Sequence, residues 1–218
     1  VRVRWMRDAM IDHFAGFDGG ERDPDSLRSL EGLSILDIGC GGGILCEPLS
    51  RLGADVLGID PAEGNIAIAR SHAGETGAPA QYRATTAEDL AAEGARFDVV
   101  CAMEVVEHVV NPAAFIATAC SMVKPGGLFF ASTLNRTAKS FALAIVGAEY
   151  VLRWVPPGTH QWEKFVTPAE LEDAIMAAGL DLHALAGISY NPLRDTWDTS
   201  RDLDVNYMVV ARRLMQMA

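Results

Sequence analysis

Short apolar segments alternate with helix-like segments along most of the chain, and this alternation constrains the fold more than any other feature of the sequence. The segments that we interpret as strands are 34–38, 54–59, 80–85, 97–103, 128–133, 180–186 and 205–211. Helical patterns lie between many of them, at 44–52, 60–73, 112–123 and 168–178. Strands joined by helices are typical of parallel βαβ units. The sequence therefore predicts an α/β protein with a Rossmann-like, doubly wound and mostly parallel sheet of seven strands.

The length of the chain fits one such domain. A chain of 218 residues buries roughly two-thirds or more of the surface that it exposes when unfolded. We predict a single domain over residues 1–218, with an N-terminal amphipathic helix over residues 1–16. Residues from about 136 to 165 form a connection longer than is usual in α/β proteins, which we interpret as an apolar insertion.

Charge and cysteine content limit the partners and the compartment. The net charge is −11, and phosphate backbones attract basic surfaces, so nucleic acid is not an expected partner. The four cysteines form no C-x-x-C pair and no cluster with histidines, which favours a reducing cytoplasm. The most membrane-like stretch, 141–155, contains Glu149 and Arg153 and is too short to cross a bilayer.

A glycine-rich string follows the first predicted strand. Residues 37–43 read Asp-Ile-Gly-Cys-Gly-Gly-Gly, and glycines allow a sharp turn and the close approach of a ligand. The next helix offers free amides and a partial positive charge to an anionic group. Asp60 closes the second strand, where a carboxylate accepts hydrogen bonds from the hydroxyls of a ribose. The pattern predicts a nucleoside-bearing cofactor that contacts Gly39, Gly41 and Asp60.

The glycine string by itself leaves the cofactor open. A dinucleotide-binding G-x-G-x-x-G pattern would place its third glycine at position 44, which is Ile44 here. The acid Asp37 and the G-C-G-G-G string instead look like the first motif of class I methyltransferases, which use S-adenosylmethionine. A dinucleotide enzyme and a plain strand–turn–helix with surface glycines remain as alternatives.

Two further cofactor contacts follow from the order of the strands, because ligands of open α/β sheets lie beyond the carboxyl ends of the strands. Methyltransferases hold the adenine after the third strand, where this chain offers backbone amides, with Ala87 as the candidate, or the carboxylate of Glu88. Many methyltransferases have Asp where this chain has Thr86. Met103 ends the fourth strand, either near the methionine half of the cofactor or as a core methionine.

Two glutamates and a histidine follow the fourth strand. If residues 104–108 form one helical turn, Glu104, Glu107 and His108 share a face. Such an oxygen-rich set favours Mg²⁺ or Mn²⁺, and the metal would orient a catechol and lower the pKa of one hydroxyl. Two alternatives remain open. Glu104 or His108 acts as a general base without a metal, or these side chains are structural.

Several longer motifs resemble one family of enzymes. They are residues 36–45 around the glycine string, Met-Glu-Val-Val-Glu-His at 103–108, Ser-Thr-Leu-Asn-Arg at 132–136, Val-Gly-Ala-Glu-Tyr at 146–150 with Gly-Thr-His at 158–160, Phe-x-x-Pro-Ala-Glu-Leu at 165–171, and Asp-Val-Asn-Tyr-Met at 204–208. Together they resemble the ubiquinone-biosynthesis O-methyltransferase family, over residues 2–208. The motifs from residue 146 onward are more specific than the glycine string, which all class I methyltransferases share.

The resemblance implies an enzyme that uses S-adenosylmethionine to methylate a ring hydroxyl of polyprenylated phenols and catechols in ubiquinone biosynthesis. It implies cofactor contacts at Arg2, Gly39, Asp60 and Met103. It also implies a Mg²⁺ site formed by Glu104 with residues 107 and 108. Other proteins of the same pathway are expected partners.

The apolar insertion bears on how such a substrate is reached. A molecule with an isoprenoid tail lies in a bilayer, and an apolar, tryptophan-bearing segment either docks at that surface or packs as a lid. We expect a cytoplasmic protein, peripheral at the inner face of the membrane. His160 is a candidate catalytic residue of the phenol pocket or a plain surface histidine. Rival interpretations are a methyltransferase for another small molecule and a non-catalytic lipid-binding subunit with the same fold.

Overall fold

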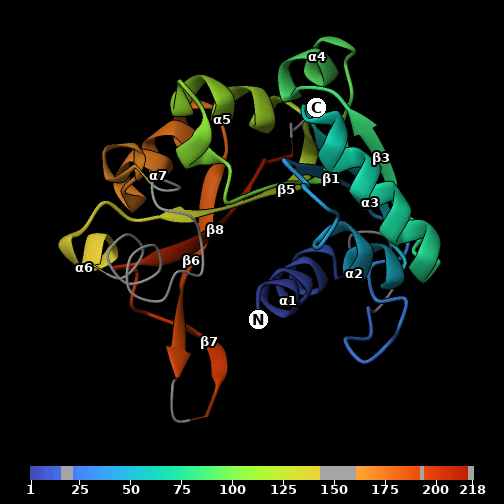
Figure 1. The fold of residues 1–218 in the computed structure, drawn as a ribbon, viewed down its shortest axis with the longest axis horizontal. Helices are drawn as coiled ribbons and strands as arrows, with labels where there is room; N and C mark the ends of the chain where they lie inside the picture. The colour runs from blue at the N-terminus through green and yellow to red at the C-terminus, as the bar shows by residue number, and fades with distance from the viewer. Residues whose placement is uncertain (16–21, 143–160, 192–193, 216–218) are drawn as a thin grey trace.

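One mixed sheet runs through the computed structural model, which describes residues 1–15, 22–142, 161–191 and 194–215. Within these residues the sheet has eight strands in the order β3-β2-β1-β4-β5-β8-β6-β7 (Figure 1). The strands are β1 (Ser34–Ile38), β2 (Asp55–Asp60), β3 (Gln81–Ala84), β4 (Phe97–Met103), β5 (Val123–Leu134), β6 (Asp181–Asn191), β7 (Thr196–Ser200) and β8 (Asn206–Arg212). The first five are parallel. The predicted fold class is confirmed, with one strand more than predicted.

The antiparallel part of the sheet begins at β8, which lies between β5 and β6 and is antiparallel to both. Among the described strands, β7 pairs only with β6, also antiparallel, and this hairpin projects from the body of the molecule (Figure 1). Because β8 runs opposite to β5, its first residue, Asn206, pairs with Leu134 at the carboxyl end of β5. The start of β8 therefore lies at the same edge as the ends of β4 and β5.

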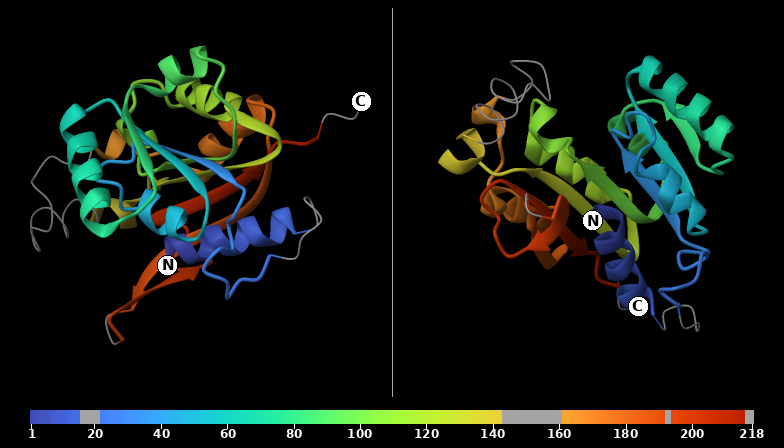
Figure 2. Two further views of the ribbon diagram at one scale, coloured as in Figure 1. Left: turned by 90° about the vertical axis from the view of Figure 1, so that its right-hand side faces the viewer. Right: turned by 60° about the horizontal axis from the view of Figure 1, so that its bottom comes forward.

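Helices cover both faces of the sheet (Figure 2). They are α1 (Arg2–Phe14), α2 (Cys46–Arg51), α3 (Glu63–Thr76), α4 (Ala87–Ala92), α5 (Pro112–Ser121), α6 (Ala138–Ser140) and α7 (Pro168–Ala177), with the 3-10 turns η1 (Val106–His108) and η3 (Trp162–Lys164). Apolar residues of α1, α2 and α3 form one buried cluster, and those of α4, α5 and α7 form a second. The sheet thus has a core on each side, as its apolar strands require.

The N-terminal helix is positioned by its apolar stripe. Met6 and Met10 of α1 are fully buried, and the Trp5 ring meets the Phe130 ring of β5 edge-on at 5.8 Å. Such burial stabilises the docking of a helix that has no side-chain cap at its start. It places the first residues of the chain beside the carboxyl ends of the strands. The predicted helix at 1–16 is present as Arg2–Phe14.

Part of the predicted insertion can be placed, and part cannot. Residues 143–160, with the motif at 146–150 and His160, lie outside the described residues. Phe141 precedes these residues in the chain and Trp162 follows them. The two rings meet edge-on, with 6.4 Å between their centroids. The Trp162 indole donates to the carbonyl oxygen of Thr137 at 3.0 Å. In the part of the chain that the structure describes, no helix is long and apolar enough to cross a bilayer.

Candidate active site

The glycine loop follows β1 and is fixed by β2. The amide of Gly39 donates to the carbonyl oxygen of Ile59 at 2.8 Å. Gly39, Gly41 and Gly43 have φ angles of +71°, +53° and +85°, in the left-handed region that favours glycine. A Cβ atom at position 39 would lie 2.6 Å from a methyl carbon of Val105. The loop therefore needs glycine at position 39 for its conformation and for the close approach of the chain after β4.

Asp60 joins the glycine loop to the start of α3. Its side chain is buried. Oδ2 accepts hydrogen bonds from the amide of Gly41 and from Nδ2 of Asn65, both at 3.2 Å, and Oδ1 accepts from the amide of Ala62 at 2.8 Å. Each carboxylate oxygen has two acceptor sites, so Asp60 keeps capacity for a ligand. The structure brings the predicted residues Gly39, Gly41 and Asp60 together, and their contact with a cofactor stays a prediction.

Asp37 lies buried beneath the loop, with 3% of its surface exposed. Its Oδ2 accepts a hydrogen bond from the thiol of Cys46 at 3.2 Å. Burial raises the pKa of Asp37 from 3.8 to about 7, because a charge is poorly solvated there; the Cys46 bond lowers it and the charge of Asp60 raises it. The acid before the glycines is therefore protonated over much of the acidic pH range in the folded protein.

Glu104 collects hydrogen bonds from three distant segments of the chain. Its Oε1 accepts from Nη2 of Arg2 at 2.6 Å, from Oγ of Ser132 at 2.8 Å and from Nδ2 of Asn206 at 2.8 Å. These residues belong to α1, β5 and β8. The φ angle of Glu104 is +58°, which is uncommon for a residue with a side chain. The backbone amide of Glu104 donates a hydrogen bond to the carbonyl oxygen of Ser132 at 2.9 Å, and this bond helps to hold the conformation.

Glu107 lies beside Glu104 but is more deeply buried, with 5% of its surface exposed. Oγ1 of Thr133 donates to its Oε2 at 2.8 Å. Burial first, and then the charge of Glu104, raise the pKa of Glu107 to about 7, although the hydrogen bond from Thr133 lowers it. The two carboxyl groups therefore lie close enough beyond β4 for the charge of one to affect the pKa of the other.

The predicted metal set is not assembled in this arrangement. Val106–His108 is a single 3-10 turn, and the left-handed backbone of Glu104 breaks the helical repeat that would have placed residues 104, 107 and 108 on one face. His108 is exposed, whereas Glu107 is buried. Across the described residues, no three His, Cys, Asp or Glu side chains are grouped so that they could hold a metal ion. The prediction of one helical turn was wrong, and these residues do not fit a three-ligand site.

The other predicted contacts are placed as follows. Ala87 is the first residue of α4 and is buried, and Glu88 beside it is exposed. The side chain of Thr86 accepts a hydrogen bond from the Asp89 amide at 3.1 Å and so caps α4. Met103 is half-buried and packs against the core on the α1 side. The contacts of Ala87 and Met103 with a cofactor remain predictions.

Three polar residues of this site carried no predicted role. Ser132 and Thr133 are fully buried within β5, where most neighbours are apolar, and Asn206 begins β8. A buried polar side chain requires a hydrogen-bond partner. Consecutive hydroxyl residues at the end of an apolar strand were therefore the signal in the sequence, although their partners could be identified only from the folded chain.

Comparison with known proteins decides the family. Residues 14–185 match the family described as "Methyltransferase domain". The ubiquinone biosynthesis O-methyltransferase of Methylobacterium nodulans is 60% identical over 213 residues, which cover 98% of this chain and 83% of that protein. The protein of the same name from Brucella anthropi is 58% identical, with 98% and 84% covered. The chain belongs to the ubiquinone biosynthesis O-methyltransferase family. The resemblance predicted from the motifs is confirmed, and the chain is a methyltransferase rather than a dinucleotide enzyme.

Solved structures agree on the fold of this O-methyltransferase. The magnesium protoporphyrin IX methyltransferase of Synechocystis PCC 6803, solved with bound SAH, superposes with a TM-score of 0.66 at 20% identity, over 96% of this chain and 83% of that one. A SAM-dependent methyltransferase of Methanosarcina mazei gives 0.63 at 18% identity, over 85% and 94%. At these identities the likeness shows the methyltransferase fold alone.

Proposed function

We propose that this protein transfers the methyl group of S-adenosylmethionine to a ring hydroxyl of a polyprenylated phenol or catechol in ubiquinone biosynthesis. Identities of 58–60% with proteins of that name, over 98% of this chain, support the reaction. The observation that carries the proposal is the placement of the Glu104–Glu107 pair next to the glycine loop. Val105, between the two glutamates, approaches Gly39 so closely that a Cβ there would collide with it.

In this proposal some residues of the chain bind the cofactor and others take up the proton of the substrate. When bound, S-adenosylmethionine supplies an electrophilic methyl group on a positively charged sulfur. Gly41 leaves open backbone for a ligand, because a Cβ atom there would meet nothing within 4 Å, and Asp60 accepts hydrogen bonds from hydroxyl donors. The carboxyl pair of Glu104 and Glu107 lies beside that loop and takes the proton of the ring hydroxyl. Arg2 keeps Glu104 in place through the 2.6 Å ion pair.

In the first hypothesis the carboxyl pair removes the proton without a metal, and Arg2, Ser132 and Asn206, which donate to Oε1 of Glu104, stabilise its charge in place of a cation. Assistance by Mg²⁺, which the family resemblance implies, is the second hypothesis. It requires His108 to move from its exposed position toward the two glutamates. Activity that persists after thorough chelation supports the first hypothesis, and activity that returns only with added Mg²⁺ supports the second.

The decisive experiment is a methyl-transfer assay with labelled S-adenosylmethionine and a short-chain prenyl catechol. The Glu104→Gln variant should lose roughly 10²- to 10⁴-fold in kcat, the usual contribution of general acid–base catalysis. Glu63→Gln, which changes an exposed glutamate at the start of α3, is the matched control and should behave as the wild type. The proposal is wrong if no phenol or catechol, prenylated or plain, accepts the methyl group.

We also propose that the protein binds peripherally to the membrane surface through the insertion at about 136–165. The described end of this insertion supports the proposal, because Phe141 leaves 46% of its surface exposed and exposed aromatic side chains suit the interface of a bilayer. Phe141→Asp should weaken co-sedimentation with anionic liposomes. Equal sedimentation of variant and wild type would contradict it. Binding to other proteins of the pathway stays a prediction.

A further inference from the structure

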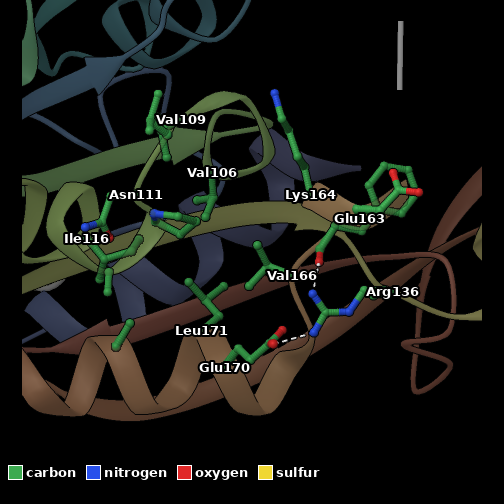
Figure 3. Close-up of a pocket in the computed structure, with 15 residues that line it drawn as sticks. Val106, Val109, Asn111, Ile116, Arg136, Glu163, Lys164, Val166, Glu170 and Leu171 are labelled. Atoms are coloured by element: carbon green, nitrogen blue, oxygen red, sulfur yellow. Dashed lines mark hydrogen bonds and ion pairs between the residues drawn. The ribbon is translucent and has the colours of Figure 1, made fainter. Parts of the chain in front are cut away.

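A groove on the α5–α7 side of the sheet is bounded by η1, the turn that carries Glu107, and Figure 3 shows the residues that line the groove. Its volume is about 520 Å³, within the range of pockets that hold small organic ligands. Val106 and Val109 line it from η1 and the loop after it, Ile116 from α5, and Leu171 and Ala174 from α7. We propose that this groove binds the isoprenoid tail of the substrate. The inference rests on the proposed function, because that function supplies the tail.

The turn η1 connects the groove to the site. Val106 is fully buried and lines the groove, whereas the next residue, Glu107, does not line it and accepts a hydrogen bond from Thr133. One short turn therefore presents an apolar wall to the groove and a carboxyl group to the site. The segment after β5 makes the same connection, because Arg136, three residues after Thr133, also lines the groove. A ring beside Glu107 would therefore lie next to the wall of the groove that Val106 forms.

The chemistry of the groove favours an apolar ligand over a charged one. Its charged residues lie at the rim, where Arg136 pairs with Glu170 and also donates to the Phe165 carbonyl oxygen at 3.2 Å (Figure 3). The bonding capacity of Arg136 and Glu170 is therefore largely used, and the two other charged residues of the lining, Glu163 and Lys164, carry opposite charges. Val110, which also lines the groove, is fully exposed. An apolar chain would cover this valine, and removal of such surface from water drives binding.

The test compares two substrates in variants that fill the groove. Ala113 lines the groove from an exposed position at the start of α5, and Ala117, one turn later, is exposed but does not line it. We measure kcat/KM for a farnesylated catechol and for the same catechol without the tail. The preference of the wild type for the tailed substrate should fall by roughly tenfold or more in Ala113→Trp, the scale of discrimination in apolar pockets. In Ala117→Trp it should not change.

A second pair of variants approaches the groove from the opposite wall. Ala174→Phe should reproduce the loss of preference, and Ala177→Phe, on the exposed side of α7, should not. Thermal unfolding reports whether each variant is folded. If Ala113→Trp and Ala174→Phe both keep the wild-type preference while folded, the tail does not bind here.

Failure of the proposed function gives a different result. If the wild type methylates no catechol at all, binding of farnesol to the same four variants, followed by calorimetry, decides on the groove alone. Farnesol binding that Ala113→Trp and Ala174→Phe weaken, and that the two controls leave unchanged, supports an isoprenoid site even then. Farnesol that binds all variants equally, or does not bind the wild type, overturns the inference.

Discussion

Replacement of Asp37 by Asn should flatten the dependence of protein stability on pH. The folded protein keeps a proton on this buried carboxyl up to a pH of about 7, whereas the unfolded chain releases it near its ordinary value of 3.8. Between these values the folded state binds the extra proton, so a rise in pH disfavours the folded state. The contribution is most favourable below the lower pKa, decreases as the pH rises, and is fully lost above the higher one. Asn, which has the shape of the protonated acid, removes this dependence.

The magnitude follows from the two pKa values. Each pH unit between them corresponds to about 1.36 kcal/mol. Over the accessible window, from about pH 5 to about pH 8, Asp37 should therefore lower the free energy of unfolding by about 2.5 kcal/mol. Solvation of the site by water that enters the loop would reduce this figure. The amide of Asn adds a hydrogen-bond donor at a buried position, and that cost does not depend on pH.

The assay is urea unfolding at several pH values, followed by tryptophan fluorescence. The difference in unfolding free energy between Asp37→Asn and the wild type should grow in favour of the variant as the pH rises. Asp55→Asn, which changes an exposed carboxylate at the start of β2, is the control and should run parallel to the wild type. If the unfolding free energy of Asp37→Asn also changed with pH in the same way as that of the wild type, the assignment of a raised pKa to Asp37 would be refuted.

Three other variants test the packing of the site. Gly39→Ala combines a strained φ angle with a clash against Val105. It should destabilise the fold by about 1–3 kcal/mol and abolish measurable binding of S-adenosylhomocysteine in calorimetry; binding at wild-type affinity would contradict the loop geometry. Tyr207→Phe removes the buried hydroxyl that donates to the Val166 carbonyl at 2.9 Å. It should cost about 1–3 kcal/mol in urea unfolding, because an acceptor is left unpaired, and a neutral result would mean that another donor replaces it. Thr167→Ala removes the capping side chain of α7, with an expected loss of about 1 kcal/mol; no change in the melting temperature would show that the cap is dispensable.

The sequence predicted best those elements whose pattern is local. The fourth strand was predicted at 97–103 and is found as Phe97–Met103, because its apolar run ends at charged residues. The helix predicted at 168–178 is Pro168–Ala177, since Thr167 and Glu170 form a complete capping box. Such signals lie within a few residues of the element that they define and need no knowledge of the rest of the chain.

The errors occurred where tertiary contacts decide the conformation. The segment 104–108 has the composition of a helical turn, but Glu104 is held at positive φ by bonds to Ser132 in the neighbouring strand. The strand β7 was missed because its side chains are largely exposed and show no apolar face. The helix α4 was missed because it is only six residues long. The ion pair between Arg2 and Glu104 joins residues 102 positions apart, so no local pattern could predict it.

The place of β8 in the sheet has a consequence for how the protein is made. β8 is the final strand of the described sequence, yet it lies between β5 and β6 and supplies Asn206 to Glu104. While a ribosome is still producing the preceding residues, β5 and β6 have no partner between them and present open edges. The full set of hydrogen bonds to Glu104 therefore cannot form before Asn206 has left the ribosome, and a product that terminates before this residue would expose the unpaired edges of β5 and β6 to aggregation.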